Sequence, residues 1–599
     1  MPMINIEVDW LNRLLGRSFA PEEIAESLEQ LGCDVEEIVE ISRHRCPRCQ
    51  AFVESSAGAV EVRRCPFCGH ESDWPFDAVG RLKVIRLDLL AARPDLFDVG
   101  GLARALRGFL EVTHGLPNYG VEPGPVEVEV SPEVESPGCF RPFIRCATMT
   151  MPPVDEASLV SIMKLQESLH WGIGRDRKLS SIGVYDLATL RGTIYYRAID
   201  PDGAAFEPLG MPGRPMTGRQ ILTQHPKGIA YAHLLTDCSR YPYLVDAQGQ
   251  ALSMPPVINS EATKLRIGTR RLFIDVTGIS EAAVVKSLDT LVCSLIELGG
   301  KAELVAIRGP RGALTSPDLT ARRTEIDLEA ARKWLGIPLG ADALVRALRR
   351  MRFEVEPSDT EKRLFQVSYP VFRTDVKHMV DIFEDLAIGF GYANIEPRLV
   401  TTLTLGEARS EELVASTARS ALLGLGLSEV MTLPLYTEED HFERLREPVP
   451  DRYVRVANPK MKGLTVVRSH LLGGLLQILH ENRRRPLPLR LFEIDNVVHL
   501  EAEAETGTRE ERHVAFVDMG PEAGYASVRT VLDSLLRELG GSALYAPHDS
   551  PTFIPGRCAT FTASNGMSGR LGELHPEVIT GLGLDHPVAT AEIVLGREV

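Results

Sequence analysis

Residues 6–36 read IEVDWLNRLLGRSFAPEEIAESLEQLGCDVE, and residues 326–356 read IDLEAARKWLGIPLGADALVRALRRMRFEVE. The two stretches align without a gap at a constant offset, which places Gly16 on Gly336. In both, the pattern predicts a short strand, a helix, a glycine turn, a second helix with apolar positions at i, i+3 and i+7, and a return strand. The sequence therefore predicts two copies of one helix-turn-helix-like module. Such a module either binds nucleic acid or packs against its neighbours, and the pattern leaves both open.

The chain around these modules is long, mixed in composition and acidic. Its 599 residues exceed what one hydrophobic core supports, so we expect several domains. A hydrophobic fraction of 44% and a charged fraction of 25% exclude a disordered or fibrous protein. The net charge of −16 disfavours a protein that coats nucleic acid indiscriminately. Because we find neither a signal-peptide pattern nor an apolar run of membrane-spanning length, we expect a cytoplasmic protein with no membrane partner.

Two Cys-x-x-Cys pairs follow the first module copy. Cys46, Cys49, Cys65 and Cys68 have the spacing C-x2-C-x15-C-x2-C, which is typical of a tetrahedral zinc site. Four thiolates leave no open position on the metal, so the zinc is expected to be structural. We expect this ribbon, at about residues 43–72, to be an insertion into a surface loop. It acts either as a scaffold or as a phosphate contact through six basic side chains: Arg43, His44, Arg45, Arg48, Arg63 and Arg64.

An acidic segment follows the second module copy. Its four carboxylates are Asp375, Asp381, Glu384 and Asp385. On a helix that begins near Thr374, the last three share one face through i, i+3 and i+4 spacing, with Asp375 near the first turn. Carboxylate oxygens clustered in this way suit Mg²⁺. The alternative is a solvated acidic face, or carboxylates favoured by the positive end of the helix dipole.

The remaining pattern completes a multidomain α+β fold. From about residue 125 to 310, β-rich runs broken by Pro and Gly turns predict a separate α+β domain. After about residue 400, the helix-and-strand pattern predicts an antiparallel sheet flanked by helices. We therefore divide the chain into residues 1–120 with the inserted ribbon, 121–315, 316–398 with the acidic helix, and 399–599.

Five phrases of the chain resemble the β subunit of phenylalanyl-tRNA synthetases and occur in that family's order. They are RPDLFDVGGLARALRGFL (93–110), HPKGIAYAHLL (225–235), LSMPPVINSEATKL with LFIDVTG (252–278), FRTDVKHMVDIFEDLAIGFGYANI (372–395) and GELHPEV (572–578). Their length and order argue against chance. The resemblance covers nearly the whole chain apart from the ribbon, and the MPPVINSE phrase is similar to the short archaeal and eukaryotic type.

This resemblance implies a class II synthetase in which an α subunit makes phenylalanyl-adenylate from ATP. The β subunit of the α2β2 heterotetramer is expected to organise the complex, help to bind tRNA(Phe) and hydrolyse tyrosine wrongly attached to it. Residues 399–599 are expected to be a degenerate, inactive copy of the class II catalytic domain, consistent with the lack of a G-x-G-x-x-R motif there. By position, Asp375, Asp381, Glu384 and Asp385 match the family's Mg²⁺ ligands.

The resemblance also implies an editing pocket in the β-rich middle domain. The matching phrases supply Asn259, Ser260 and Glu261 on a turn, and Asp275 and Thr277 at a strand end. Accepting tyrosine while rejecting phenylalanine requires a buried polar partner for the phenol hydroxyl, which Asp275 or Glu261 would supply. The structural alternative is that Asn-Ser-Glu caps a helix and that Asp275 closes a turn.

Two other functions stay open beside the synthetase subunit. One is a stand-alone nucleic-acid-binding protein built from the two modules and the zinc ribbon. The other is a free-standing aminoacyl-tRNA deacylase that needs no partner. The net charge of −16 and the order of the five phrases speak against the first alternative. The second predicts that the isolated chain hydrolyses mischarged tRNA.

Overall fold

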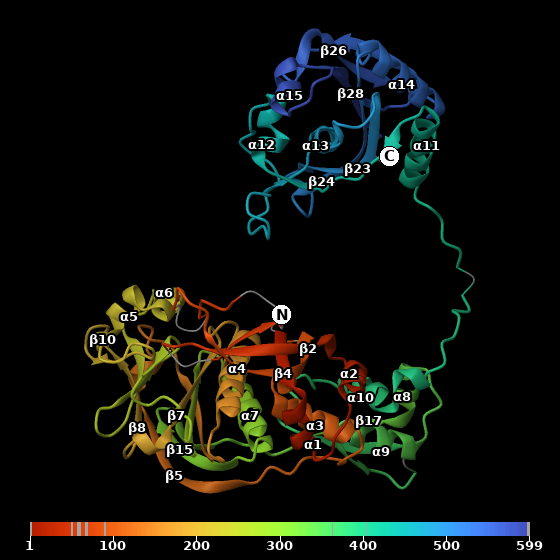
Figure 1. Ribbon diagram of the computed structural model, residues 1–599. Coiled ribbons are helices and arrows are strands. Elements are labelled where there is room, and N and C mark those ends of the chain that lie inside the picture. Colours follow the sequence, from red (N-terminus) through yellow and green to blue (C-terminus); the bar gives the residue numbers. More distant parts are fainter. Residues whose placement is uncertain are drawn as a thin grey trace. The chain divides into compact units, whose positions relative to one another are not determined.

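The chain folds into two compact units, Met1–Arg398 and Leu399–Val599, and each is considered by itself. The computed structural model describes residues 3–48, 52–56, 61–65, 70–88, 91–361, 363–402 and 404–595. Several antiparallel and mixed sheets alternate with helices along the chain, which confirms the multidomain α+β class (Figure 1). Among the described residues, no helix has both the length and the apolar composition that crossing a membrane requires.

Both predicted module copies are present in the first unit. The first copy consists of β1 (Met3–Glu7), α1 (Val8–Leu15), α2 (Pro21–Gln30) and β2 (Asp34–Arg45). The second consists of β17 (Arg322–Asp327), α8 (Leu328–Leu335), α9 (Ala341–Arg350) and β18 (Glu354–Pro357). In each copy the first helix ends at a glycine with positive φ, 73° at Gly16 and 72° at Gly336. Glycine adopts this left-handed conformation without steric cost, so the repeated glycine fixes the turn between the helices.

A third strand completes each module by returning between the other two. β4 (Asp77–Asp88) pairs antiparallel with both β1 and β2, and β19 (Leu364–Tyr369) pairs in the same way with β17 and β18. The ribbon segment, with β3 (Phe52–Ser56), lies in the connection between β2 and β4. The equivalent connection in the second copy spans only residues 358–363. The ribbon is therefore an insertion into a loop of the first copy.

A ten-stranded sheet dominates the middle of the first unit. Its strands are β5 (Val121–Val130), β6 (Phe143–Thr150), β7 (Ser180–Asp186), β8 (Ile194–Ile199), β11 (Tyr241–Val245), β12 (Ala251–Met254), β13 (Ile258–Asn259), β14 (Arg271–Gly278), β15 (Lys301–Gly309) and β16 (Gly312–Ser316). Their order is β13-β12-β11-β8-β5-β15-β6-β14-β7, with β16 on β15. Phe273 from one end of this order and Leu252 from the other share one buried cluster, so the sheet curls around it.

The helices of the modules and of the middle region share a single core. α7 (Glu281–Glu297) packs on β6, β7 and β14, and α4 (Glu156–Gly172) lies beside it (Figure 1). The buried cluster that contains Leu291 of α7 also contains Leu11 and Leu28 of the first module and Leu348 of the second. The apolar faces of the module helices are therefore used for packing against their neighbours.

The second unit is built on a seven-stranded sheet of order β20-β23-β24-β28-β27-β26-β25, in which only β20 and β23 are parallel. Its strands are β20 (Ser428–Glu429), β23 (Leu489–Leu500), β24 (Thr508–Met519), β25 (Ala543–Pro547), β26 (Phe553–Ala563), β27 (Ser568–Leu574) and β28 (Val588–Val594). α11 (Ser410–Gly424) and α14 (Tyr525–Glu538) pack together on one apolar cluster of the sheet (Figure 1). α13 (Leu472–Asn482) belongs to a second cluster. The predicted antiparallel sheet with flanking helices is confirmed.

Candidate functional site

A cluster of buried polar side chains lies inside the curled ten-stranded sheet. Asp275 on β14 is only 1% exposed, and the Tyr185 hydroxyl on β7 donates a hydrogen bond to its Oδ1 at 2.6 Å. The same hydroxyl is 2.8 Å from Oγ of Ser253 on β12. Because β7 and β12 stand near opposite ends of the strand order, this contact joins the two ends of the sheet. The cluster therefore depends on the curl of the whole sheet.

Gly183 makes room for this contact. It is paired with Asp275 across β7 and β14. A Cβ atom at Gly183 would lie 2.0 Å from the Tyr185 hydroxyl oxygen and 2.4 Å from Asp275 Oδ1. Real Cβ atoms do not approach other atoms so closely, so a residue larger than glycine would force the phenol and the carboxyl group apart.

Burial changes the ionisation of both partners. Removal from water raises the pKa of Asp275 to about 7, although the hydrogen bond from Tyr185 and the charge of Arg141 act in the opposite direction. Burial, together with the nearby Asp275, also raises the pKa of Tyr185 well above its ordinary value. Near neutral pH, the Asp275 carboxyl group is therefore divided between its neutral and charged forms, and the phenol keeps its proton.

Thr277 belongs to the same face of β14, two residues beyond Asp275. Arg141, which is 4% exposed, donates to Thr277 Oγ1 at 3.1 Å and to its carbonyl oxygen at 2.8 Å. Ser181 Oγ accepts from Arg141 at 2.9 Å. The pKa of Arg141 is lowered by burial, which outweighs the opposite effects of Tyr196 and Asp275. The cluster thus combines a carboxyl group, a phenol, hydroxyls and one guanidinium, all of them buried.

The Asn259-Ser260-Glu261 segment lies partly beside this cluster. Asn259 is paired with Ser253 in the sheet, so it stands opposite the serine that contacts Tyr185. Ser260 is buried, and its amide donates to the Leu252 carbonyl at 2.7 Å. Glu261 instead accepts from the Gly210 amide at 3.0 Å and pairs with Lys264.

Two local expectations for these residues are wrong. Asp275 lies in the middle of β14 and does not close a turn, and of the two residues only Thr277 is next to the strand end. The Asn-Ser-Glu segment does not cap a helix, because the described residues 262–270 that follow it contain turns and no helix. Ser260 instead forms an isolated β-bridge with Pro208. Long-range strand pairing has overridden the local capping and turn preferences.

The acidic segment differs from its prediction at the helix start. α10 (Met379–Phe390) begins five residues later than expected, so Asp375 lies in a turn ahead of it. Asp381 accepts from the backbone amides of Lys377 and His378, each at 2.7 Å, and so forms part of a capping box at the N-terminus. The helix therefore starts at the point where the Asp381 carboxylate accepts hydrogen bonds from these amides.

The four carboxylates do not converge on one point. Within the described ranges, no three of them bring their oxygens within 4.8 Å of one another. Arg373 lies between Asp375 and Asp385 and is ion-paired with both, whereas Glu384 is exposed. Burial acts to raise the pKa of Asp375, but the charge of Arg373 outweighs burial and lowers the pKa to about 2. For Asp385 burial prevails over Arg373 and raises the pKa.

One carboxylate oxygen of this segment would suit a bound cation. Asp385 is 2% exposed, and its Oδ1 has no hydrogen-bond partner among the described residues. A buried carboxylate oxygen without a partner is costly unless it accepts a hydrogen bond or ligates a metal. The donor type fits Mg²⁺, but the Arg373 clamp does not, since the guanidinium already occupies the space between two of the four carboxylates.

Comparison with known proteins identifies the family of the chain. Residues 395–595 match the family model described as the phenylalanyl tRNA synthetase beta chain CLM domain, and residues 324–392 match the tRNA synthetase B5 domain. The phenylalanine–tRNA ligase beta subunit of Methanothrix thermoacetophila is 39% identical over 85% of this chain and 92% of its own length. That of Methanococcus maripaludis is 32% identical over 99% of this chain and 100% of its own length. The chain belongs to the phenylalanyl-tRNA synthetase beta-chain family. It is therefore a subunit of a phenylalanine–tRNA ligase, an aminoacyl-tRNA synthetase of protein biosynthesis.

A solved structure supports the same family. The crystal structure of an N-terminal fragment of the phenylalanyl-tRNA synthetase beta subunit from Pyrococcus horikoshii is similar, with a TM-score of 0.56 and 31% identity. The match covers 65% of this chain and 99% of that fragment. The predicted resemblance to this family is confirmed.

The ribbon is described only in part. Cys49 and Cys68 lie outside the described residues, so the four-cysteine site stays a prediction. Cys46 and Cys65 are both fully buried and pack in one small cluster with Val53 and Phe76, so one cysteine from each pair reaches the same core.

Most basic side chains around the ribbon have acidic partners. Arg45 pairs with Glu156 at 3.0 Å, and Arg64 pairs with Glu71 at 3.3 Å. Further pairs join Arg43 to Glu7 and Glu54, and Arg63 to Glu61. These carboxylates neutralise much of the charge that a phosphate contact would use, which favours the scaffold interpretation.

Sequence reasoning missed three members of the Asp275 cluster, namely Tyr185, Ser253 and Arg141. Ser253 lies in one of the family phrases, but Tyr185 and Arg141 stand in none, and the three join the cluster from β7, β12 and the segment before β6. The glycine at position 183, in the middle of the strand SSIGVYD, was an available signal, since such a residue often marks a close approach.

Proposed function

We propose that this chain is the β subunit of an α2β2 phenylalanyl-tRNA synthetase that works in the cytoplasm, binds tRNA(Phe) and supports phenylalanylation by the α subunit. The observation that carries the proposal is the similarity to beta subunits along nearly the whole chain. ATP is used on the α subunit, and residues 399–599 serve as an inactive copy of the catalytic domain. We further propose the four functional parts 1–120, 121–315, 316–398 and 399–599, of which the last coincides with the second compact unit.

The test is phenylalanine-dependent ATP–pyrophosphate exchange by the chain alone and by the chain co-expressed with the α subunit from the same genome. Exchange only in the presence of the α subunit is expected. If the chain neither binds the α subunit nor supports exchange, the subunit proposal fails. Binding of nucleic acid by the isolated chain would then favour the zinc-ribbon protein, and hydrolysis of mischarged tRNA by the isolated chain would favour the free-standing deacylase.

We propose that the second activity is hydrolysis of Tyr-tRNA(Phe) in the Asp275 cluster. Here water attacks the ester carbonyl, the bond to the tRNA ribose oxygen breaks, and that oxygen takes up a proton. Tyr185 supports this proposal, because its phenol hydroxyl already donates to Asp275 at 2.6 Å. Asp275 thus already accepts a hydrogen bond from a phenol hydroxyl of the protein, which is the group by which tyrosine differs from phenylalanine. A site with such a buried polar partner discriminates strongly against the substrate that lacks the hydroxyl.

The remaining predicted editing residues take supporting roles in this proposal. Thr277 is held by Arg141 on the same face as Asp275, and Asn259 stands opposite Ser253. Ser260 and Glu261 brace the loop that follows β13, through the Leu252 carbonyl and the Gly210 amide respectively. We expect Glu261→Gln to affect editing less than a change at Asp275, which hydrolysis of Tyr-tRNA(Phe) measures directly.

We propose that Asp375, Asp381, Glu384 and Asp385 bind Mg²⁺ when Arg373 releases its two carboxylates. The support is the unpartnered Oδ1 of Asp385 and the clustering of acidic residues. Mn²⁺ is a suitable probe, because bound Mn²⁺ is counted by electron paramagnetic resonance. Asp385→Asn is expected to remove one bound ion, and the exposed Glu396→Gln is the matched control. An unchanged count in Asp385→Asn overturns the site.

We propose that Cys46, Cys49, Cys65 and Cys68 bind a structural Zn²⁺ that holds the ribbon together. The burial of Cys46 and Cys65 in one cluster supports this assignment. Cys65→Ser is expected to remove one zinc per chain in elemental analysis and to leave ATP–pyrophosphate exchange unchanged. If zinc content stays the same in Cys65→Ser and in Cys46→Ser, the ribbon is not the zinc site. Loss of tRNA binding after charge reversal of Arg48 would favour the phosphate-contact role.

A further inference from the structure

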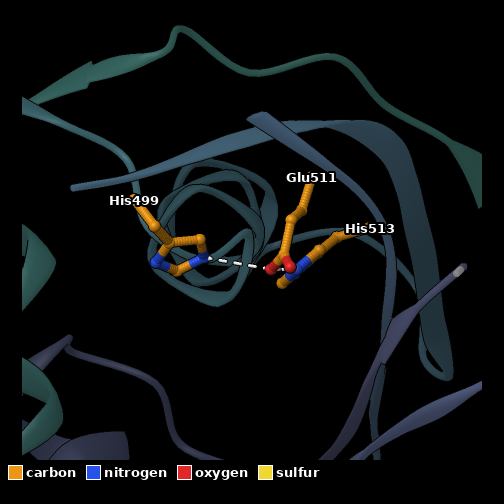
Figure 2. Close-up of side chains that lie close together, drawn as sticks. All are labelled: His499, Glu511 and His513. Carbon is orange, nitrogen blue, oxygen red and sulfur yellow. Dashed lines mark ion pairs between the residues drawn. The ribbon is translucent and has the colours of Figure 1, made fainter. Parts of the chain in front are cut away.

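Three side chains of types that bind metals lie together on one face of the seven-stranded sheet in the second unit. They are His499, near the end of β23, and Glu511 and His513 on β24 (Figure 2). One ligating atom from each lies within 4.8 Å of the other two. This group is separate from the Asp275 cluster, the acidic segment and the ribbon.

The register of the β23–β24 hairpin brings the three together. The antiparallel pairs are Asp495 with His513, Val497 with Glu511, and His499 with Arg509. Side chains two apart on a strand point to the same face, and directly paired residues share that face. Val497 is buried in the cluster that contains α13, so the three ligands lie on the α13 side of the sheet. The strand pairing therefore fixes the relative positions of the Glu-x-His pair on β24 and the histidine on β23.

The separations match a tetrahedral metal. Glu511 Oε2 lies 3.4 Å from His499 Nε2 and 3.6 Å from His513 Nε2. Zinc bonds to nitrogen and oxygen of about 2.0–2.1 Å place neighbouring tetrahedral ligands about 3.3 Å apart. Arg509 pairs with Glu511 through Oε1 and with Glu501 at 2.9 Å, and Glu511 Oε2 faces both histidines.

His513 is oriented as a metal ligand. It is 7% exposed, and its Nδ1 is 2.8 Å from Glu592 Oε1. The Leu471 amide also donates to this carboxylate, at 2.9 Å. The lone pair of His513 therefore lies on Nε2, which faces Glu511 and has no hydrogen-bond partner among the described residues. A carboxylate that fixes the tautomer of a ligating histidine is the usual outer-shell partner in zinc sites.

We propose that His499, Glu511 and His513 bind a Zn²⁺ ion, with a fourth coordination position open. Two imidazoles and a carboxylate are a donor set that suits zinc better than Mg²⁺, which prefers oxygen ligands alone. The ion links β23 to β24 near the turn of their hairpin, which spans residues 501–507. Its open position takes water or a side chain of another molecule.

Cobalt(II) titration of the full chain in complex with the α subunit tests the proposal. Co²⁺ replaces Zn²⁺ and reports its ligands, because thiolates add strong near-ultraviolet charge-transfer bands and a histidine–carboxylate site gives visible d–d bands without them. We expect one equivalent of Co²⁺ with d–d bands only, in addition to any equivalent bound by the ribbon. Cys46→Ser removes the charge-transfer bands and leaves this equivalent in place.

The variants that test the site are His499→Ala and Glu511→Gln, since both side chains are partly exposed and their loss leaves the core intact. Combined with Cys46→Ser, which removes the ribbon's Co²⁺, both are expected to lower Co²⁺ affinity at least about tenfold and to abolish the remaining d–d bands, while ATP–pyrophosphate exchange confirms folding. The exposed His548→Ala is the matched control. The proposal is overturned if the wild type binds no equivalent outside the ribbon, or if d–d bands persist when His499→Ala is combined with Cys46→Ser.

Discussion

Asp275 and Glu592 are both buried carboxyl groups on strands with antiparallel neighbours, yet their pKa values move in opposite directions. The pKa of Asp275 rises to about 7, because burial outweighs a phenol hydrogen bond and the charge of Arg141. The pKa of Glu592 falls to about 2, because His513, His470 and Arg570 together outweigh the same burial penalty. Burial alone therefore does not set the charge of a carboxyl group. Its partners decide whether the site holds a proton or a negative charge.

The first way to sharpen this contrast is the pH dependence of Asp275→Asn. A pKa raised from 3.8 to about 7 means that the folded state holds the proton more tightly, so stability is lost as the pH rises from about 4 to about 7. The full difference between wild type and variant corresponds to about 4 kcal/mol across that window. Hydrogen exchange of the β14 amides measures it locally. Equal pH slopes in wild type and variant would show that Asp275 titrates normally.

Glu592→Gln breaks the other side of the comparison. A pKa lowered from 4.5 to about 2 stabilises the fold above about pH 4.5, and this contribution is lost as the pH falls towards 2. At pH 7 the variant should lose about 3 kcal/mol, seen as faster exchange of the β28 amides. Glu510→Gln, on an exposed glutamate of β24, is the control. If both variants exchange alike, the buried contact between Glu592 and His513 contributes nothing.

Gly183→Ala tests the geometry of the Asp275 cluster without removing any of its polar groups. The added Cβ would collide with the Tyr185 hydroxyl and the Asp275 carboxyl group. We expect the local stability of β7 and β14, measured by hydrogen exchange of their amides, to fall by about 2 kcal/mol. Editing should also become weaker. Gly80→Ala on β4, where a Cβ meets no atom within 4 Å and φ is not positive, is the matched control. A loss no larger than in this control contradicts the close packing.

Tyr185→Phe removes the phenol hydroxyl alone, and the smallest effect is expected here. Asp275 Oδ1 and Ser253 Oγ each lose one contact, which costs about 1 kcal/mol. Because the hydrogen bond from Tyr185 lowers the pKa of Asp275, the midpoint of the pH-dependent loss should move to higher pH. A midpoint that stays in place would mean that the phenol does not hold the carboxylate form.

The repeated modules show how much of the fold is readable from the sequence. Their helices, turns and return strands follow from apolar spacing and from the glycines at positions 16 and 336, and the structure contains them at the predicted places. The start of α10 was misplaced, although the His378–Asp381 capping box was available as a signal. Local patterns thus determine elements well when a cap or a glycine marks the boundary.

The sites were less readable because they depend on strand pairing. Asp275 was selected through the family phrase, but Tyr185 and Ser253 come from strands near opposite ends of the sheet order. The His499 group likewise needs the register of β23 with β24, and the Glu-x-His spacing on β24 is informative only once that strand is known. Curl and register arise from the packing of whole sheets, which no short motif encodes.

Hydrolysis of Tyr-tRNA(Phe) by the complex is the most direct test of the account, with Asp275→Ala compared with Asp289→Asn. Asp289 is a fair control, because burial also raises its pKa to about 7 and it lies on α7, outside the cluster. We predict that Asp275→Ala lowers the hydrolysis rate about 100-fold and keeps phenylalanylation, whereas Asp289→Asn hydrolyses normally. Normal hydrolysis by Asp275→Ala, with phenylalanylation intact, would contradict the account.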